Sequence, residues 1–228
     1  ACADVELWPS EDGVCRVEFQ EEQCCTASVA GGVLHIQELR RHRVGLTLDL
    51  SIGGRQLLDV PMRDNALRVY LPARTYRMLR AETRSGEIEV SAGLSFDRAV
   101  LRSASGDVEF RAAVQIELRI HTASGDIEVK HSAPERMQLE TASGDVELSG
   151  CGASSVTVRT SSGDVEFADC DETALDIRTA SGDIDGRFSV PRAVSASSVS
   201  GEIDVPRSGS GAPCVLHTAS GDIDVCVK

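Results

Sequence analysis

One short motif recurs through the last two-thirds of this chain of 228 residues. Ser-Gly followed by an acid occurs eight times, with glycines at Gly86, Gly106, Gly125, Gly144, Gly163, Gly182, Gly201 and Gly221. The intervals between these glycines are 20, 19, 19, 19, 19, 19 and 20 residues. A fixed period of this length predicts a repeat architecture in which each repeat is one supersecondary unit.

Each repeat contains two short stretches in which apolar and polar residues alternate. Two and four residues after the glycine stand apolar residues such as Val146 and Leu148, with acids on either side of the first. Seven and five residues before the glycine stand further apolar pairs, such as Met137 and Leu139. This alternation is typical of a strand with one buried face. The pattern therefore predicts two strands in each repeat, joined by the Ser-Gly-acid segment.

The side chains that we expect to be buried lie an odd number of residues before the glycine and an even number after it. One straight strand cannot bury both sets on one face, so the chain must turn a corner at that segment. We attribute the glycine to its access to left-handed or otherwise strained backbone conformations. Thr or Ser also stands three residues before each glycine, at Thr83, Ser103, Thr122, Thr141, Thr160, Thr179, Ser198 and Thr218. We interpret this column as structural hydroxyl stacking, in preference to a flat array that orders water or ice.

A single repeat cannot bury its own apolar side chains, but stacked repeats can, with equivalent strands pairing in parallel about 4.8 Å apart. We therefore predict an all-β fold, a single-stranded β-solenoid (β-helix) with about 19 residues per rung and successive repeats in register. Residues 81–228 form the eight-repeat solenoid. Residues 1–80 lack the motif and form irregular N-terminal rungs and a cap. We expect one continuous domain, with a separate small β domain at 1–80 as the alternative.

Acidic residues outnumber basic ones by 36 to 23, which gives a formal net charge of -13. This excess disfavours nucleic acid and anionic membranes as partners and favours cations and basic proteins. No stretch approaches the ~20 apolar residues of a membrane-spanning helix, so we predict no transmembrane segment in this chain. Because the chain begins at Ala1 rather than Met, we expect residues upstream, which leaves room for a leader or a membrane anchor.

Several segments together resemble a known bacterial family. They are the early DVELWPSEDGVCRVEF, the GGVLHI strand, the entry LRVYLPARTYRMLRAETRSGEIEV and the run of TASGDIEV-like repeats. The chain resembles an adhesin-type β-strand-repeat family, a domain of unknown function related to head-GIN auto-transporter adhesin domains. The resemblance implies a single-stranded β-solenoid, often attached to an envelope-anchored bacterial protein. It implies no established activity or active site.

Two columns of acids are the most prominent candidate site. One column directly follows the glycines, at Glu87, Asp107, Asp126, Asp145, Asp164, Asp183, Glu202 and Asp222. The other lies three residues after them, at Glu89, Glu109, Glu128, Glu147, Glu166, Asp185, Asp204 and Asp224. Carboxylate oxygens suit calcium, and the candidate ligands are Asp107, Glu109, Asp126, Glu128, Asp145, Glu147, Asp164 and Glu166. The alternative, which we favour, is a solvated face whose corner aspartates bond to the backbone.

Paired carboxylates also occur in enzymes that cleave polysaccharides. Such an enzyme needs one site whose two carboxyl groups have different environments, whereas here every rung carries the same pair. His121 and His217 share a repeat position five rungs apart, and no Ser-His-Asp or Cys-His set emerges. We therefore predict no catalytic residues and no cofactor.

The eight cysteines include no CxxC pair, which gives little support to a zinc site. Cys151 and Cys170 each follow a repeat glycine by seven residues, so we expect their Cα atoms about 5 Å apart on adjacent rungs. A disulfide and a stacked pair of free buried thiols are equal alternatives there. We interpret Cys24-Cys25 as a core-plus-surface pair rather than a redox site, and Arg40-Arg41-His42-Arg43 as a solvated loop rather than an anion site.

These observations favour a non-catalytic β-solenoid scaffold or adhesion module that presents repetitive acidic faces to a protein or glycan partner. A calcium-binding structural element is the first alternative, and a polysaccharide-active β-helix enzyme is the second. We expect a monomer or a weak end-to-end oligomer. The resemblance favours the bacterial cell envelope, whereas eight cysteines leave the cytoplasm open.

Overall fold

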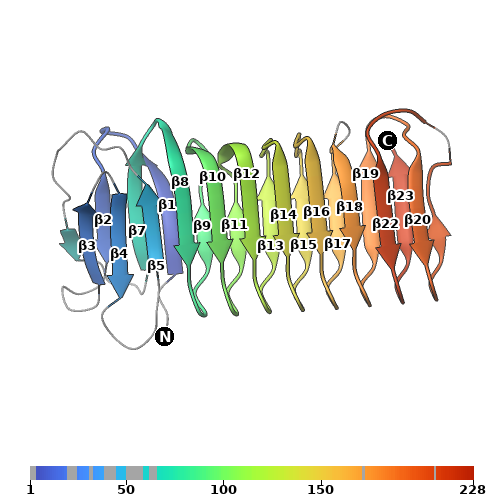
Figure 1. Cartoon of the computed structure of the whole chain (residues 1–228), viewed down its shortest axis with the longest axis horizontal. Helices are drawn as coiled ribbons and strands as arrows, with labels where there is room; N and C mark the ends of the chain where they lie inside the picture. Colours follow the sequence, from blue (N-terminus) through green and yellow to red (C-terminus); the bar gives the residue numbers. More distant parts are fainter. Residues whose placement is uncertain are drawn as a thin grey trace.

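The computed structural model shows an elongated stack of β-strands (Figure 1). It describes residues 4–19, 25–30, 33–38, 45–49, 59–61, 66–170, 173–207 and 209–228. Within these ranges the regular elements are 23 strands in two sheets that face each other across the core. No helix in the described residues is long and apolar enough to cross a membrane.

The two sheets run the length of the stack. Sheet A consists, in spatial order, of β21 (Ile203–Asp204), β23 (Ile223–Val227), β19 (Ile184–Phe188), β17 (Val165–Ala168), β15 (Val146–Ser149), β13 (Ile127–Lys130), β11 (Val108–Phe110), β9 (Ile88–Val90), β1 (Asp4–Ser10), β7 (Ala66–Pro72), β2 (Arg16–Phe19) and β6 (Asp59–Pro61). Sheet B consists of β20 (Val194–Ser198), β22 (Cys214–Thr218), β18 (Ala174–Arg178), β16 (Ser155–Arg159), β14 (Arg136–Glu140), β12 (Ala113–His121), β10 (Ser95–Arg102), β8 (Thr75–Glu82), β5 (Gly45–Asp49), β4 (Val33–Glu38) and β3 (Cys25–Ala30).

Each repeat contributes one rung, with the strand before its glycine in sheet B and the strand after it in sheet A. Neighbouring rungs pair in parallel with equivalent residues side by side, as Met137 with Val156 and Val146 with Val165. These four side chains are buried between the sheets, and the polar residues between them face outward. The prediction of an all-β solenoid with parallel stacking is confirmed.

The repeat glycines are required because the backbones of neighbouring rungs lie too close for a side chain. A Cβ atom added to Gly144 would lie 2.0 Å from the carbonyl oxygen of Gly125 on the next rung. None of the eight repeat glycines has a positive φ, so the attribution to a left-handed corner is wrong. The left-handed residues stand at another corner, six residues after the glycines, at His131, Gly150 and Asp169.

The last two repeats do not stack in chain order. The rung β22–β23 lies between β18–β19 and β20–β21 in both sheets, so the final repeat is inserted and the penultimate one ends the stack (Figure 1). The expectation that successive repeats always lie one on the next is therefore wrong at this end. The inserted rung is the more apolar of the two: Leu216 and Ile223 are buried, whereas Ile203 at the end is 40% exposed. Burial on both sides favours the rung with more apolar surface to remove from water.

A buried arginine ties together the loops that cross at this insertion. Arg192 lies between β19 and β20 and is 1% exposed. Its guanidinium donates hydrogen bonds to the carbonyl oxygens of Cys170 at 3.2 Å, Thr173 at 2.8 Å and Pro213 at 3.2 Å, and it lies 4.6 Å from the ring centroid of Phe188. The carbonyl oxygens satisfy a charged group that would be costly to bury without partners.

The N-terminal strand is also inserted out of chain order. β1 pairs in parallel with β9 on one side and with β7 on the other, so it occupies the place of a preceding rung in sheet A. Its residues Asp4-Val5-Glu6-Leu7 repeat the letters of Asp145-Val146-Glu147-Leu148. The Asp4 carboxylate accepts a hydrogen bond from the backbone N–H of Glu87 at 3.0 Å, as the repeat aspartates do for their neighbours.

Before the repeats, antiparallel pairs occur beside parallel ones such as β2 with β6. β3, β4, β5 and β8 pair antiparallel in sequence, and β2 pairs antiparallel with β7. β8 belongs to the first repeat, so sheet B continues from this region into the solenoid. The division at residue 80 and the cap remain predictions.

We expect Gly144→Ala to destabilise the fold by about 1–3 kcal/mol or more, because the new methyl group collides with the neighbouring backbone. Gly152→Ala is the matched control, since its added Cβ would meet the nearest atom, Ala133 Cβ, at 3.5 Å. Urea denaturation of both variants measures the difference. Equal stabilities would contradict the close-contact explanation.

The inserted order predicts which strands can be cross-linked. Asp176 and Val215 are register partners on β18 and β22, so cysteines at these positions should form a disulfide on oxidation. Cysteines at 176 and 195 should not, because two rung spacings of about 4.8 Å separate them. Both pairs are tested with the exposed Cys226 replaced by serine, and non-reducing electrophoresis of the intact protein reports the bond. Cross-linking of 176 to 195 alone would show chain order instead.

Candidate functional site: the acidic face of sheet A

The first acidic column, directly after the repeat glycines, holds neighbouring rungs together. Asp126 Oδ1 accepts the backbone N–H of Asp145 at 2.8 Å, and Asp145 Oδ1 accepts that of Asp164 at 2.8 Å. The pattern continues through the inserted rung, where Asp222 donates its N–H to Asp183 and accepts that of Glu202. One oxygen of each such aspartate is therefore already occupied by the backbone.

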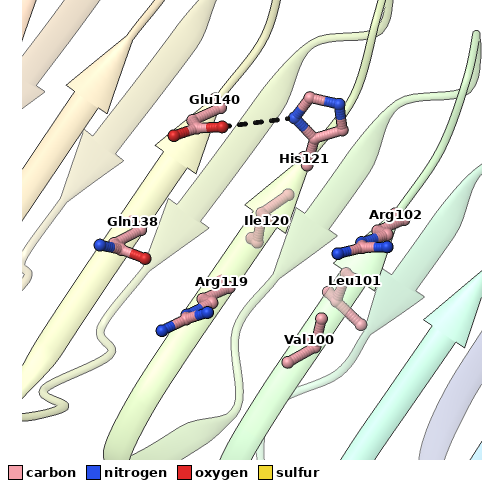
Figure 2. A pocket seen from close by; sticks show the side chains of 8 residues that line it. All are labelled: Val100, Leu101, Arg102, Arg119, Ile120, His121, Gln138 and Glu140. Atoms are coloured by element: carbon pink, nitrogen blue, oxygen red, sulfur yellow. Dashed lines mark ion pairs between the residues drawn. The ribbon is translucent and has the colours of Figure 1, made fainter.

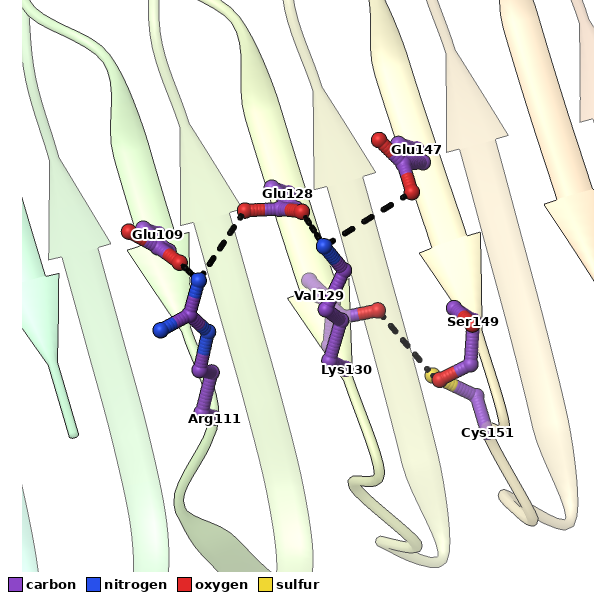
Figure 3. Close-up of polar contacts among 8 residues, drawn as sticks. All are labelled: Glu109, Arg111, Glu128, Val129, Lys130, Glu147, Ser149 and Cys151. Atoms are coloured by element: carbon purple, nitrogen blue, oxygen red, sulfur yellow. Dashed lines mark hydrogen bonds and ion pairs between the residues drawn. The ribbon is translucent and has the colours of Figure 1, made fainter. Parts of the chain in front are cut away.

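The second acidic column, three residues after the glycines, faces outward and is only partly neutralised. Arg111 contacts Glu109 and lies 3.8 Å from Glu128. Lys130 contacts Glu128 and lies 3.9 Å from Glu147. Figure 3 shows the two cations side by side between three glutamates of successive rungs. Arg111 and Lys130 stand five residues after their repeat glycines. The acids stand one and three residues after them, so two-residue alternation places the cations on the same outer face, and the sequence could have predicted these ion pairs.

The neutralisation stops one rung later. At the position of Arg111 and Lys130, the next two rungs carry Ser149 and Ala168. Among the described residues, Glu166, Asp185, Asp224 and Asp204 of the second column form no ion pair. Arg187 of β19 is the next cation at this position, beside Asp185. The part of sheet A from Asp164 to the C-terminal end therefore has acids of both columns with one cation at this position and no ion pair among the described residues.

Electrostatics within this part of sheet A oppose full ionisation. Partial burial, followed by repulsion from Asp224 and Asp183, raises the pKa of Asp185. At the other end of the repeats, partial burial followed by repulsion from Asp4 and Asp107 raises the pKa of Glu87. Both shifts have the direction expected for carboxylates crowded by like charges.

A shallow hollow runs between the two acidic columns over β13, β15 and β17. Six of the eight candidate calcium ligands line it, Asp126, Glu128, Asp145, Glu147, Asp164 and Glu166, whereas Asp107 and Glu109 lie outside it. In the described parts of the chain, no group of three or more His, Cys, Asp or Glu side chains is arranged to hold a metal ion. Cation binding by these residues remains a prediction.

A protein-family model, Toastrack DUF4097, matches residues 17–225. The chain belongs to the Toastrack family. This family is a domain of unknown function, so membership supports the β-solenoid reading and assigns no activity. No curated protein and no solved structure matches the chain.

The hydroxyl column of this Toastrack chain points inward. Thr141 is buried, accepts the N–H of Gly144 at 3.0 Å and donates to the carbonyl oxygen of Gly125 at 3.3 Å. Thr122 and Thr160 make the equivalent bonds. Each hydroxyl thus joins its own corner to the next rung, which agrees with the structural interpretation and leaves no exposed array.

The two stacked cysteines are free thiols in the structure, and both are buried. A hydrogen bond with the Cys170 side chain lowers the pKa of the Cys151 thiol, against the opposite effect of burial. The thiols therefore lie in contact across adjacent rungs, as the seven-residue offset predicted. Whether they form a disulfide on oxidation remains a prediction.

The rung insertion creates one serine–histidine contact that chain order does not predict. Ser197 Oγ lies 2.8 Å from His217 Nδ1 on the outer surface of sheet B. The register partner of His217 on its other side is Arg178, a cation, rather than a carboxylate that would orient and charge the ring. His121 lies four rung steps from His217, not five, because of the insertion. Among the described residues, no carboxylate forms an ion pair with His217, so no Ser-His-Asp set is formed there.

Two candidates cannot be placed. Cys24 and Arg40-Arg41-His42-Arg43 lie outside the described residues, and of Cys25 only the backbone is described, in β3.

We expect Asp185→Asn to raise the thermal midpoint at pH 7, because it removes a charge that the folded state disfavours. A carboxyl whose pKa is raised on folding costs stability once it ionises, so the gain should shrink as the pH falls toward the ordinary aspartate value of 3.8. Asp176→Asn is the control, since Asp176 accepts a hydrogen bond from Arg178 at 2.9 Å and should give no gain. Melting curves between pH 4 and pH 8 measure both, and a gain that grows on acidification would be contrary to this account.

Proposed function

We propose that this Toastrack chain is a non-catalytic β-solenoid scaffold whose acidic face on sheet A binds a basic protein segment. The observation that carries the proposal is the row of second-column acids from Glu166 onward, which form no ion pair among the described residues although Arg187 stands on the same face. Those acids repeat at one rung spacing, about 4.8 Å, on a flat and rigid surface. An extended segment rich in Lys or Arg could place successive cations against successive rungs.

The outer surface of sheet B supports this assignment by contrast. There the acids have basic partners: Glu117 contacts Arg119 at 2.7 Å, Asp176 contacts Arg178 at 2.9 Å, and Glu140 lies 3.6 Å from His121. The described acids of sheet B that form these pairs are therefore neutralised more fully than the second-column acids of sheet A from Glu166 onward. Complementary charge on a partner would speed encounter and fix its orientation more than it would add affinity.

The resemblance to adhesin-type repeats suggests where in the cell this scaffold would act, and it assigns no binding partner. It favours attachment at a bacterial cell envelope, and we include this setting in the proposed role. A non-catalytic role is favoured because every rung of the acidic face repeats the same chemistry. A catalytic pair needs two carboxyl groups whose pKa values are separated by different surroundings.

The binding test compares two triple variants of equal charge. Glu147→Gln with Glu166→Gln and Asp185→Asn neutralises the proposed face without touching the aspartates that bond to the backbone. Glu82→Gln with Glu140→Gln and Asp176→Asn makes the same change on sheet B. We expect a fluorescent deca-lysine peptide to bind the wild type and the sheet B variant alike, and the sheet A variant about tenfold or more weakly.

Fluorescence anisotropy at two salt concentrations measures this, because exposed charges interact less strongly at high ionic strength. Equal weakening by both triple variants would show attraction to net charge alone and would refute a specific acidic face.

Calcium is the competing occupant of the same face. If the hollow between the columns is a calcium site, millimolar calcium should raise the melting temperature more than the same concentration of magnesium. We expect no such difference, since each first-column aspartate already accepts a backbone N–H. A calcium-specific shift that the sheet A variant loses would favour the cation-binding alternative.

A further inference from the structure

The outer surface of sheet B carries a local concentration of arginine that the proposed function does not use. Val100 faces outward at the middle of β10 and is half-buried. Its register partners on the neighbouring strands are Arg80 of β8 and Arg119 of β12. Two residues before and after it on its own strand stand Arg98 and Arg102. All four nearest outward neighbours of Val100 are therefore arginines.

The groups at the corners of this arrangement only partly balance the four charges. The corners are Met78, Glu82, Glu117 and His121, by the same strand register. Glu117 accepts two hydrogen bonds from Arg119, at 2.7 and 2.9 Å, and Glu82 lies 3.8 Å from Arg80. Among the described residues, Arg98 and Arg102 form no ion pair. Two guanidinium groups therefore remain available beside an apolar side chain.

The surface is hollowed at this point (Figure 2). Val100, Arg102, Arg119 and His121 are among the residues that line the hollow. The figure shows Arg102 and Arg119 on opposite sides of it, with His121 and its partner Glu140 together at one end. Arg102 of β10 and Arg119 of β12 thus face the hollow, and Arg80 of β8 stands next to the same valine by strand register.

We propose that this cluster of four arginines, of which Arg102 and Arg119 line the hollow, binds a compact oxyanion, a phosphate or sulfate group. Guanidinium groups present planar pairs of donors that match the oxygens of such a group. Arg80 and Arg119 stand two rung spacings apart, about 10 Å between Cα atoms, so one tetrahedral anion lies within reach of both side chains. Val100 offers an apolar floor for the carbon group that carries an ester.

The charge of the whole molecule selects a compact anion over a long one. With a net charge of -13, the protein repels an extended polyanion that runs beyond the hollow. At physiological salt, charges more than about 8 Å away are largely screened, so a small ligand responds mainly to the arginines beside it. Nucleic acid, long anionic glycans and anionic membranes are disfavoured by the same reasoning.

The experiment follows the melting temperature and the heat of binding of the full chain with inorganic phosphate, with phenyl phosphate and with sodium chloride at matched ionic strength. We expect saturable stabilisation by the phosphates and none by chloride. Arg98→Gln with Arg102→Gln should weaken binding about tenfold or more, because two charged donors are removed. The matched control is Arg136→Gln with Arg159→Gln, two sheet B arginines outside the hollow that form no ion pair among the described residues.

Tighter binding of phenyl phosphate than of inorganic phosphate would identify an ester as the ligand, and equal binding would identify the free ion. Equal losses in the two double variants would overturn the site, because they would show an effect of net charge alone. Preferential binding to vesicles that contain phosphatidic acid would overturn the restriction to a compact anion. None of these results depends on the acidic face of sheet A.

Discussion

The close approach of neighbouring backbones at the Ser-Gly-acid corner is the contact on which the rest of this structure depends. With no Cβ on Gly144, the carbonyl oxygen of Gly125 can occupy that space, and the two rungs settle at strand spacing. Thr141 then reaches both glycines, and the carboxylate of Asp126 reaches the N–H of Asp145. The threonine, the glycine and the acid are thus one hydrogen-bonded unit that satisfies the corner where the sheet hydrogen bonds are interrupted.

This unit has an electrostatic consequence. Because each rung needs an acceptor after its glycine, sheet A acquires a column of carboxylates one rung spacing apart, and a second column follows on the same face. Like charges at such distances repel by about 1 kcal/mol per pair in water, less with salt, which the chain tolerates since hydrogen bonds and the apolar core outweigh it. Arg111 and Lys130 relieve the repulsion over three rungs only. The strong acidity of the remaining rungs has no structural need that we can identify, and this is why we connect it with binding.

The two ends of the run of repeats follow the same chemistry. At each end a segment near the chain terminus is inserted next to a rung whose acid is glutamate. The Asp4 carboxylate accepts the backbone N–H of Glu87, and the Asp222 carboxylate accepts that of Glu202. In the described residues neither glutamate side chain accepts an N–H from a neighbouring rung. With one more methylene, a glutamate carboxylate lies farther from the next backbone amide. Insertion of Asp222 between Asp183 and Glu202 keeps the ladder of aspartates unbroken, in addition to burying the more apolar rung.

The sequence by itself determined the solenoid, the inward positions and the outward acids, because a 19-residue period and a two-residue alternation each permit one solution: equivalent strands in register. It also contained the half-repeat at Asp4–Leu7, which the Ser-Gly-acid motif does not reveal because that segment lacks the motif. Only the tertiary structure decided the order of the last two rungs, since repeats that are nearly alike can exchange places and their linkers permit either order. The arginines around Val100 were likewise hidden, because they come from three strands, with 17 to 22 residues between arginines of neighbouring strands, and meet only through the parallel register.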